Sequence, residues 1–239
     1  MKRNWESVVL KALGGKDFRL TVLASERVNG RYQRLEVDGG GLLAACAIHP
    51  TMWIRLWFDR DGRAHQRAYT IVDPDLATGR FSLEFALHDG TAARWAQTAE
   101  PGDTVDATVQ GSAFALPAPQ PARWFGVGDA ASVPAVNSLL DTLPAVPGTI
   151  WLEYAHDEER DLPVRARSGH EVHWVPRRDG GAHLVGTVCA ALPAAPDAFY
   201  WVAAEAASTR AIARHVRRGL GVEKDRVSSL AYWRDVSHS

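Results

Sequence analysis

The chain has little cysteine, no long hydrophobic run and no excess charge of either sign. Its 239 residues include only two cysteines, Cys46 and Cys189, which are too few for the four thiolates of an iron–sulfur cluster or for a disulfide framework. The formal net charge of −1 excludes general nucleic-acid binding, which needs a strongly basic surface. Because no segment has the length and apolarity of a secretion signal or a membrane span, we expect a cytoplasmic protein.

The chain does contain enough apolar material for a packed core. Hydrophobic residues make up 46% and charged residues 23% of the sequence, which is typical of globular proteins with one large domain or two of ordinary size. The histidines are scattered, and only His170 and His173 have a spacing that suggests a metal site. We interpret these two as surface residues and expect no metal bound by the protein.

Short strand-like segments dominate the first half of the chain. After a helical lead-in over residues 1–16, six segments alternate apolar and polar residues and are separated by Gly, Asp and Asn turns. This pattern predicts a six-stranded antiparallel β-barrel over residues 17–117. The strands are expected at residues 18–27, 32–37, 51–59, 66–72, 80–88 and 103–109, with short helices at 42–47 and 91–98.

The second half has a different pattern. Three prolines within residues 116–121 indicate a stiff linker, which we place at residues 118–122. Strand-like and helix-like segments then alternate over residues 123–239, which predicts an α/β domain with a parallel sheet. A barrel followed by such a domain suggests one cofactor on the barrel and one dinucleotide on the sheet. Strands are expected at 124–128, 149–154, 171–175, 199–204 and 227–232, and helices at 132–143, 181–192 and 206–218.

The segment Arg67-Ala68-Tyr69-Thr70 carries residue types that suit a flavin nucleotide. On a strand, Arg67 and Tyr69 share one face and Thr70 points to the other side at the strand's end. A cation for a phosphate, a ring for stacking and a hydroxyl for the flavin's edge would then lie within one small volume. The alternative is an ordinary strand with an exposed arginine and a half-buried tyrosine.

A strand-to-helix turn further along provides a candidate phosphate site. Gly90, Ala92 and Ala93 carry little side chain, so a phosphate could approach the unpaired N–H groups at the positive end of the helix. Thr91 adds a hydroxyl donor. The alternative is a plain strand–turn–helix corner, which is common in proteins.

Two further features lie in the expected α/β domain. The segment Gly126-Val127-Gly128-Asp129-Ala130-Ala131 matches the loose dinucleotide fingerprint Gly-x-Gly-x-x-Ala and opens the first strand–helix turn. No acidic residue has the spacing usual for a ribose contact, although Glu153 ends the next expected strand; the alternative is a glycine turn with a solvent-facing Asp129. At the C-terminus, Tyr232 and Trp233 follow the last strand, where aromatic residues tend to pack against a neighbouring domain or a flat ligand.

Taken in order along the chain, these features resemble the siderophore-interacting protein family, which consists of FAD-dependent ferric-siderophore reductases on a ferredoxin-reductase-like scaffold. The resemblance extends over nearly the whole chain. The matching stretches are residues 67–70, His88 with Trp95, the Pro-Gly-Asp at 101–103, Gly128-Asp129 with Pro134-Ala135, and the Tyr-Trp-Arg at 232–234.

The resemblance implies a role for each matching residue. Arg67 would contact the FAD phosphates, Tyr69 would stack on the isoalloxazine, and Thr70 would hydrogen-bond near its reactive nitrogen. Tyr69 and Thr70 are therefore the expected catalytic residues. The other expected cofactor contacts are Ala86, Leu87, His88 and Trp95 for the flavin, Gly90, Thr91, Ala92 and Ala93 for the pyrophosphate, and Gly128, Asp129, Ala204, Glu205, Tyr232 and Trp233 on the side of NADH or NADPH.

Three features depart from the family pattern. The turn over residues 88–93 lacks the family's proline, and Ala204 and Ala231 stand where glycines are expected. A β-carbon at either alanine would narrow the path of the nicotinamide.

Arginines outside these motifs are candidates for substrate contacts. An anionic ferric chelate would favour a basic rim, for which Arg55 and Arg234 are candidates, although a solvated arginine is the simpler interpretation of Arg55. A second set could bind the extra phosphate of NADPH or form a solvated helix face. This set consists of Arg210, Arg214, Arg217 and Arg218, with Ser208 and Thr209.

The sequence therefore predicts an FAD-dependent NAD(P)H oxidoreductase that reduces ferric siderophores and releases ferrous iron, without a nucleophile or general base. A flavin oxidoreductase with another small-molecule or biosynthetic acceptor is the first alternative. A non-catalytic binding protein with a decayed flavin site is the second, and the presence of Arg67, Tyr69 and Thr70 argues against it. The sequence does not choose between NADH and NADPH and does not define an oligomeric state.

Overall fold

The computed structural model of this chain describes residues 15–60 and 62–235. The chain divides into two compact units, one ending at Phe114 and the other beginning at Ala115. Each unit has its own sheet and its own hydrophobic core. Most of the lead-in expected over residues 1–16 lies outside the described residues, and Lys16 begins a strand rather than ending a helix.

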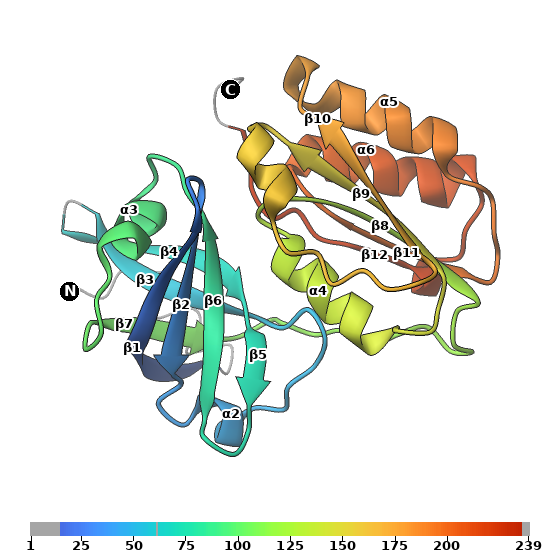
Figure 1. Ribbon diagram of the computed structural model, residues 1–239. Coiled ribbons are helices and arrows are strands. Elements are labelled where there is room, and N and C mark those ends of the chain that lie inside the picture. Colours follow the sequence, from blue (N-terminus) through green and yellow to red (C-terminus); the bar gives the residue numbers. More distant parts are fainter. Residues whose placement is uncertain (1–14, 61, 236–239) are drawn as a thin grey trace. The chain divides into compact units, whose positions relative to one another are not determined.

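The first unit is built around an antiparallel sheet of seven strands (Figure 1). The order of strands across the sheet is β4-β3-β7-β1-β2-β6-β5, so early and late strands are interleaved. The strands are β1 (Lys16–Asn29), β2 (Tyr32–Asp38), β3 (Trp53–Arg60), β4 (Arg63–Thr70), β5 (Val72–Asp75), β6 (Arg80–Ala86) and β7 (Thr104–Val109), and the helices are α2 (Leu42–Ala45) and α3 (Thr91–Thr98).

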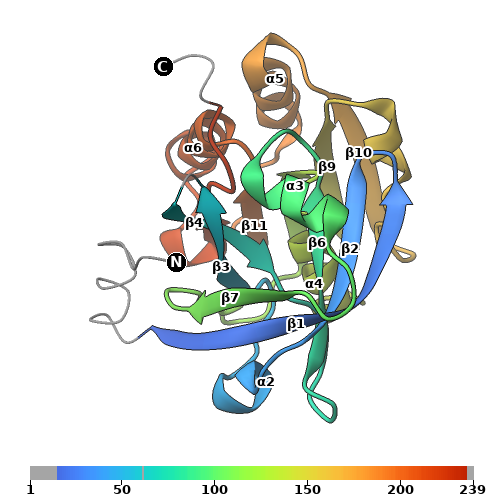
Figure 2. The ribbon, with the colours of Figure 1, turned by 90° about the vertical axis from the view of Figure 1, so that its left-hand side faces the viewer.

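The sheet has seven strands instead of the expected six because one expected strand is divided into two. The segment expected as a single strand over residues 66–72 is split at Ile71 into β4, which pairs with β3, and β5, which pairs with β6. Because β4 and β5 are the two edges of the sheet and only Ile71 lies between them, the chain passes directly from one edge to the other. The sheet is thereby curled into a half-barrel, as Figure 2 shows.

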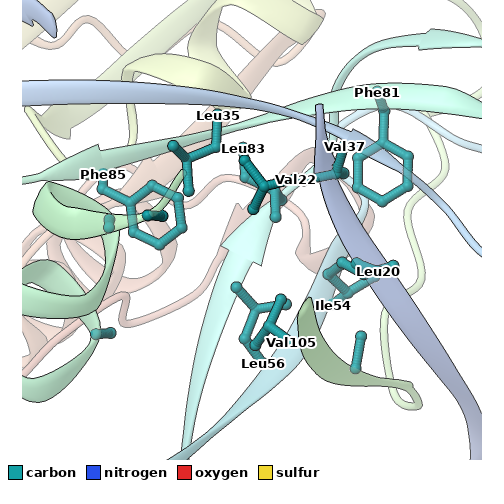
Figure 3. Packing of buried hydrophobic residues seen from close by; sticks show 14 of the residues in the cluster. Leu20, Val22, Leu35, Val37, Ile54, Leu56, Phe81, Leu83, Phe85 and Val105 are labelled. Atoms are coloured by element: carbon teal, nitrogen blue, oxygen red, sulfur yellow. The ribbon is translucent and has the colours of Figure 1, made fainter. Parts of the chain in front are cut away.

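Alternation along the strands places one set of side chains in a common core inside the curled sheet. Leu35 of β2, Leu83 of β6 and Ile54 of β3 are fully buried and lie in the space between the strands (Figure 3). Burial of each such side chain contributes roughly 1.5–3 kcal/mol. Helix α3 packs its small buried residues, Ala93 and Ala96, against the same core, which fixes the position of the helix relative to β6.

The second unit contains a parallel sheet of five strands in the order β10-β9-β8-β11-β12. The chain moves outward from β8 to β10 and then crosses back to β11, so the order reverses between β8 and β11. In sheets of this kind, ligands bind outside the carboxyl ends of the strands at the reversal. The strands are β8 (Arg123–Asp129), β9 (Gly148–Tyr154), β10 (His170–Pro176), β11 (Ala198–Ala203) and β12 (Val227–Ser229).

Helices cover both faces of the parallel sheet. Helix α4 (Val133–Thr142) lies on one face, and α5 (Ala182–Ala191) and α6 (Ala206–Arg214) lie side by side on the other (Figure 1). The central strands are accordingly apolar on both sides. Trp124 and Val127 of β8 and Tyr200 and Val202 of β11 are all buried.

Several element ends differ from the sequence expectation. The helix expected over residues 206–218 ends as α6 at Arg214, and a π-helical turn over His215–Gly219 follows. The last expected strand, 227–232, is regular only over Val227–Ser229. Short 3-10 turns occur at Asp157–Asp161, Asp179–Gly181 and Lys224–Arg226. No helix within residues 15–60 and 62–235 is long and apolar enough to cross a membrane.

Candidate functional site

Strands β3 and β4 of the first unit place the expected flavin residues. In their register Tyr69 pairs with Ile54 and Arg67 pairs with Leu56, and both partners are core residues. Because directly paired residues share one face of a sheet, Arg67 and Tyr69 lie on the core-facing side of β4. Arg67 is exposed there, Tyr69 is half-buried, and Thr70 at the end of the strand is buried.

Tyr69 lies where the two ends of the curled sheet approach each other. Its ring packs on Phe85 of β6, with ring centroids 4.2 Å apart and planes at 41°. β6 pairs with β2 along its whole length, but its pairing with β5 extends only to Ser82. Within the described residues the ladder between β5 and β6 ends at Ser82, and we expect the backbone of Ala86, further along β6, to hydrogen-bond a flat ligand at Tyr69. The N–H of Leu87 is not available to such a ligand, because it donates to the carbonyl of Arg31 at 2.7 Å.

The turn after β6 forms the candidate phosphate site. Nδ1 of His88 accepts a hydrogen bond from the Gly90 N–H at 2.9 Å. A β-carbon on Gly90 would lie 2.2 Å from the His88 ring, so a larger residue would displace that ring. Gly90 directly precedes α3, and no side chain caps that end of the helix. The first N–H groups of α3, from Thr91 to Ala93, therefore lack intrahelical partners and can bind an anion.

Aromatic packing fixes α3 beside β6. The ring centroid of Trp95 lies 5.5 Å from that of Phe58 and 6.1 Å from that of Phe85. Phe85 thus contacts both Trp95 on the helix and Tyr69 on β4. Trp95 supports the helix through the core, and it brings the turn and the tyrosine to one place.

Burial and neighbouring charges perturb two titratable groups of this site. Burial raises the pKa of the Tyr69 phenol above its ordinary value, although the Arg67 guanidinium acts in the opposite direction. Partial burial lowers the pKa of His88, and the charges of Arg67 and Arg94 lower it further against the opposing effect of Asp89. At neutral pH we therefore expect an un-ionised tyrosine and a neutral imidazole whose Nδ1 remains a hydrogen-bond acceptor.

In the second unit the glycine fingerprint folds into a tight turn at the carboxyl end of β8. Oγ of Ser132 accepts a hydrogen bond from the Asp129 N–H at 2.8 Å and donates one to the Asp129 carbonyl at 3.0 Å. A β-carbon on Gly128 would lie 2.2 Å from this hydroxyl, which explains the glycine. Because the hydroxyl serves the turn, no side chain caps α4. Pro134 has no N–H and the Ala135 N–H donates to the Ser132 carbonyl at 3.0 Å, so this helix end offers an anion the N–H of Val133 and the positive end of the helix dipole.

Asp129 faces the protein interior, so its interpretation as a solvent-facing residue is wrong. It is 6% exposed, and its Oδ2 accepts a hydrogen bond from the indole N–H of Trp233 at 2.7 Å. Oδ1 accepts one from the Ala131 N–H at 3.0 Å. Burial raises the pKa of Asp129 to about 7; the Trp233 hydrogen bond opposes this shift, and the nearby charge of Glu153 adds to it.

Arg177, which no sequence motif identified, joins this edge of the sheet to residues 230–235, the C-terminal segment. Its Nη1 donates to Oε2 of Glu153 at 2.6 Å, and its Nη2 donates to Oδ2 of Asp235 at 3.3 Å. The guanidinium also lies over the Trp233 ring, 4.9 Å from the ring centroid. These partners are distant from Arg177 in sequence, so a search for short motifs could not have found the cluster.

Ala204 and Glu205, expected beside the nicotinamide, have partners of their own at the end of β11. The Ala204 N–H donates to Oγ1 of Thr209 at 3.1 Å, and the Ala204 carbonyl accepts from the Tyr232 N–H at 3.0 Å. The Glu205 carboxylate caps α6 and accepts from the Ser208 N–H at 3.1 Å. The Glu205 side chain is thus used within the helix end, and a ligand could meet only the surface beside these residues.

Arg55 does not lie beside Arg67 and Tyr69, the expected flavin-binding residues. It pairs with Ala68, so it lies on the face of β3 and β4 opposite to Arg67 and Tyr69. Its guanidinium lies over the ring of Trp53, 4.8 Å from the centroid. This placement argues against a substrate rim formed by Arg55 beside Tyr69.

The remaining arginine candidates are exposed. Arg234 is exposed beside Trp233 in the C-terminal segment. The arginines of α6 and the turn after it also point to solvent, whereas the two hydroxyl residues expected to help them bind a phosphate are buried. The exposed set is Arg210, Arg214, Arg217 and Arg218, and the buried pair is Ser208 and Thr209. This distribution favours a solvated helix face.

Two family models match the chain, one in each unit. The model described as siderophore-interacting FAD-binding domain matches residues 34–111. The model described as siderophore-interacting protein matches residues 121–236. The first match includes Tyr69 and Gly90, and the second includes Asp129, Arg177 and Trp233.

The chain is similar to two kinds of curated relative. It is 32% identical over 240 residues to the mycobactin import ATP-binding/permease protein IrtA of Mycolicibacterium smegmatis, which covers 98% of this chain. The chain spans only 28% of the length of that relative. It is also 26% identical over 242 residues to the NADPH-dependent ferric-chelate reductase of Escherichia coli, with 90% of this chain and 91% of that protein covered.

Solved structures share the architecture. The siderophore-interacting protein SipS from Aeromonas hydrophila matches with a TM-score of 0.79 and 25% identity over 93% of each chain. A ferredoxin NADP+ reductase from Neisseria gonorrhoeae, with bound FAD and NADP, matches with a TM-score of 0.67 and 12% identity over 91% of this chain and 99% of that one. The second likeness shows the fold alone. The ferredoxin-reductase-like fold expected from the sequence is confirmed, with seven antiparallel strands in place of six.

The residues present in the first unit fit FAD. The exposed Arg67 suits a phosphate, the half-buried ring of Tyr69 suits the isoalloxazine, and the backbone at the end of β6, at Ala86, suits the polar rim of that ring. The cradle at Gly90, which a β-carbon would fill, leads to an uncapped helix end that suits a pyrophosphate. In the part of the chain that the structure describes, no group of three or more His, Cys, Asp or Glu side chains is placed to hold a metal ion.

Proposed function

The chain belongs to the siderophore-interacting protein family, and on that basis we propose that it is an FAD-dependent NAD(P)H oxidoreductase that reduces ferric siderophores and releases ferrous iron. In this proposal residues 17–117 bind FAD, residues 118–122 form a linker, and residues 123–239 bind NADH or NADPH. FAD supplies a group that accepts a hydride and delivers electrons singly, which suits a ferric acceptor.

The observation that supports the proposal most strongly is the arrangement of residues around Phe85. Tyr69 and Trp95 both pack on its ring, so the strand that carries the tyrosine and the helix that offers its N-terminus meet at one side chain. Arg67 is close enough to His88 to lower the pKa of that imidazole. A stacking ring, a cation and an uncapped helix end therefore lie in one small region, as a flavin nucleotide requires.

Tyr69 and Thr70 are the residues that we propose at the flavin ring. Burial keeps Tyr69 un-ionised, so it offers a flat neutral surface for stacking. Thr70 is buried at the strand end, where its hydroxyl can make one hydrogen bond to the edge of a ring system. Arg67 would neutralise a phosphate, and the backbone of Ala86 and His88 would orient the ring.

The carboxyl edge of β8 is the proposed site of the nicotinamide dinucleotide. Gly128 allows the close turn that brings the uncapped end of α4 to this edge. A carboxylate here would repel a pyrophosphate, but burial raises the pKa of Asp129 to about 7 and so reduces its mean negative charge near neutrality. Tyr232 and Trp233 would contact the dinucleotide from the C-terminal segment.

An external acceptor follows from the cysteine content. Two cysteines cannot bind an iron–sulfur cluster, so this chain supplies no onward electron carrier of that kind. A ferric chelate is the acceptor that we propose first, because one relative is named a ferric-chelate reductase and others are named for mycobactin import.

The proposal is tested by separating flavin reduction from iron reduction. The FAD-loaded protein is reduced anaerobically with NADH or NADPH, ferric siderophores are added, and ferrous iron is trapped with a coloured chelator. We expect bleaching of the flavin absorbance, followed by its return together with the colour of the ferrous complex. Free FAD at the same concentration is the control. Rapid flavin reduction without trapped ferrous iron would contradict the proposed acceptor, and a protein that binds no FAD would contradict the flavin site.

Replacement of Gly90 by alanine is expected to weaken FAD binding about tenfold, or roughly 1.4 kcal/mol. The new β-carbon would lie 2.2 Å from the His88 ring, so the ring must move and the turn that presents the α3 N-terminus is disturbed. Gly30→Ala is the matched control, because a β-carbon there meets no atom within 4 Å. Titration of the apoprotein with FAD measures both affinities. Equal affinities of the two variants would show that the turn does not hold the cofactor.

A further inference from the structure

Residues 230–235, the C-terminal segment, are attached to the carboxyl edge of the parallel sheet. The Tyr232 N–H donates to the Ala204 carbonyl at 3.0 Å, and the Trp233 carbonyl accepts from the Ala206 N–H at 2.9 Å. The segment therefore continues the pairing of β12 with β11 beyond the regular strand. It ends at the reversal between β8 and β11, where sheets of this kind bind dinucleotides.

Two side chains fix the indole of Trp233 from different directions. Asp129, at the end of β8, accepts the indole N–H at 2.7 Å, and the Arg177 guanidinium lies 4.9 Å from the ring centroid. The hydrogen bond fixes the edge of the ring and the cation fixes its face. Trp233 is 37% exposed although two side chains contact its ring. The exposed part of the ring is thus a prepared surface at the ligand-binding edge.

Arg177 is held in turn by two carboxylates. Its side chain is 17% exposed, and it bonds the 2% exposed carboxylate of Glu153 at 2.6 Å and that of Asp235 at 3.3 Å. Gly181 makes room for this arrangement, since a β-carbon there would lie 2.5 Å from Oγ of Ser208 and 3.3 Å from Nη1 of Arg177. Arg177 is therefore a single side chain that connects the ends of β9 and β10 to the C-terminal segment.

We propose that Arg177 is a positioning residue for the nicotinamide dinucleotide, which acts by holding the ring of Trp233 at the carboxyl edge of the parallel sheet. This inference rests on the proposed function. Trp233 contacts the dinucleotide, and Arg177 acts through Trp233. A guanidinium is needed, because its flat shape stacks on the indole while its two ends bind two carboxylates, which a lysine ammonium cannot do together.

The first measurement reports on the environment of Trp233 before any nicotinamide dinucleotide is added. The FAD-loaded full chain is labelled with 5-fluorotryptophan, and Trp233→Phe assigns the 19F resonance of Trp233. We expect one sharp resonance in the wild type, a shifted or broadened one in Arg177→Gln, and a partial return in Arg177→Lys. Arg165→Gln is the matched control, because Arg165 also makes an ion pair in this unit, with Asp141 at 2.7 Å. Its Trp233 resonance should equal that of the wild type.

The second measurement uses NAD+ and NADP+, which bind without turnover. In the wild type we expect the oxidised dinucleotide to shift the Trp233 resonance, and Arg177→Gln should weaken its Kd about tenfold. In rapid flavin reduction by NADH or NADPH, the concentration for half-maximal rate should rise by a similar factor, while the limiting rate changes less. Arg165→Gln should leave both values unchanged.

A second variant keeps the test decisive if Arg177→Gln does not fold, since that change leaves the buried Glu153 carboxylate without its partner. The double variant Glu153→Gln/Arg177→Gln removes both charges and is expected to give the same resonance change and the same loss of affinity. An unchanged Trp233 resonance or an unchanged Kd in the folded variant would overturn the proposal, as would an equal loss in Arg165→Gln.

Failure of this proposal and failure of the proposed function give different results. In one outcome, NAD+ or NADP+ shifts the Trp233 resonance, but neither NADH nor NADPH reduces the flavin. That outcome would contradict the proposed function and leave the positioning role intact. A flavin that is readily reduced while the Trp233 resonance does not respond to any dinucleotide would contradict the positioning role alone.

Discussion

Replacement of Tyr69 by alanine is expected to weaken FAD binding about tenfold to a hundredfold, which corresponds to roughly 1.4–2.8 kcal/mol. The tyrosine ring is the flat surface proposed for the isoalloxazine, and its orientation is set by contact with Phe85 at 4.2 Å. Tyr69→Phe keeps this surface, and since burial keeps the phenol un-ionised, the hydroxyl adds no charge to the site. We therefore expect Tyr69→Phe to bind FAD nearly as tightly as the wild type, as measured by titration of the apoproteins.

Packing loss must be separated from cofactor loss in this experiment. Tyr69 also contacts the core of the first unit, so Tyr69→Ala lowers the thermal stability of the apoprotein as well. Tyr154→Ala removes a half-buried tyrosine from the second unit and is the matched control, with FAD affinity expected to be unchanged. If Tyr69→Ala binds FAD as tightly as Tyr69→Phe, the stacking role of Tyr69 is wrong.

Asp129 is expected to make the protein less stable as the pH rises from about 4 to about 7. The folded state keeps this carboxyl protonated up to a pKa of about 7, whereas the ordinary value of 3.8 applies to the unfolded chain. Between these values the folded state binds more protons than the unfolded state, so the free energy of unfolding falls with rising pH and levels off above pH 7. Over the whole interval this one group accounts for a decrease on the order of 4 kcal/mol.

Asp129→Asn removes this titration, and its stability relative to the wild type should increase between about pH 4 and about pH 7 and then level off. Urea denaturation of both proteins at several pH values gives the difference. A difference between Asp129→Asn and the wild type that stays constant with pH would show that Asp129 does not titrate in this range.

The two sheets could be predicted because alternation and apolar runs are local properties of the sequence. In β2, the buried apolar Leu35 and Val37 alternate with the polar Arg34, Glu36 and Asp38, and this pattern identifies both the strand and its core face. In the second unit, apolar strands alternate with helices because both faces of the sheet are covered. These features depend on neighbours a few residues apart, so they are visible without the fold.

The division at Ile71 and the faces of the arginines depend on strand pairing and were not visible. Residues 66–72 read as one strand in the sequence, and only the pairing with β3 on one side and with β6 on the other separates β4 from β5. Arg55 and Arg67 both lie on amphipathic strands. The register that pairs Arg67 with Leu56 places the two arginines on opposite faces.

The cluster around Arg177 could not be predicted for a related reason. Its partners Glu153, Trp233 and Asp235 come from different elements, and they meet only because parallel strands align their carboxyl ends. The sequence places Asp129 in a glycine turn on the expected dinucleotide side, and nothing in the sequence indicates that it is buried. Its burial depends on the return of the C-terminal segment, which brings Trp233 to it.

The closure of the half-barrel has a consequence for the cofactor. β4 and β6 meet through the rings of Tyr69 and Phe85, and within the described residues no backbone ladder joins these two strands. The sheet is therefore open between β4 and β6. The proposed flavin would lie between these strands, stacked on Tyr69 of β4 and hydrogen-bonded to the backbone at the end of β6. If FAD binds there as proposed, its loss would loosen the contact between β4 and β6 as well as remove the redox group, and the apoprotein would be less stable than the FAD-loaded protein.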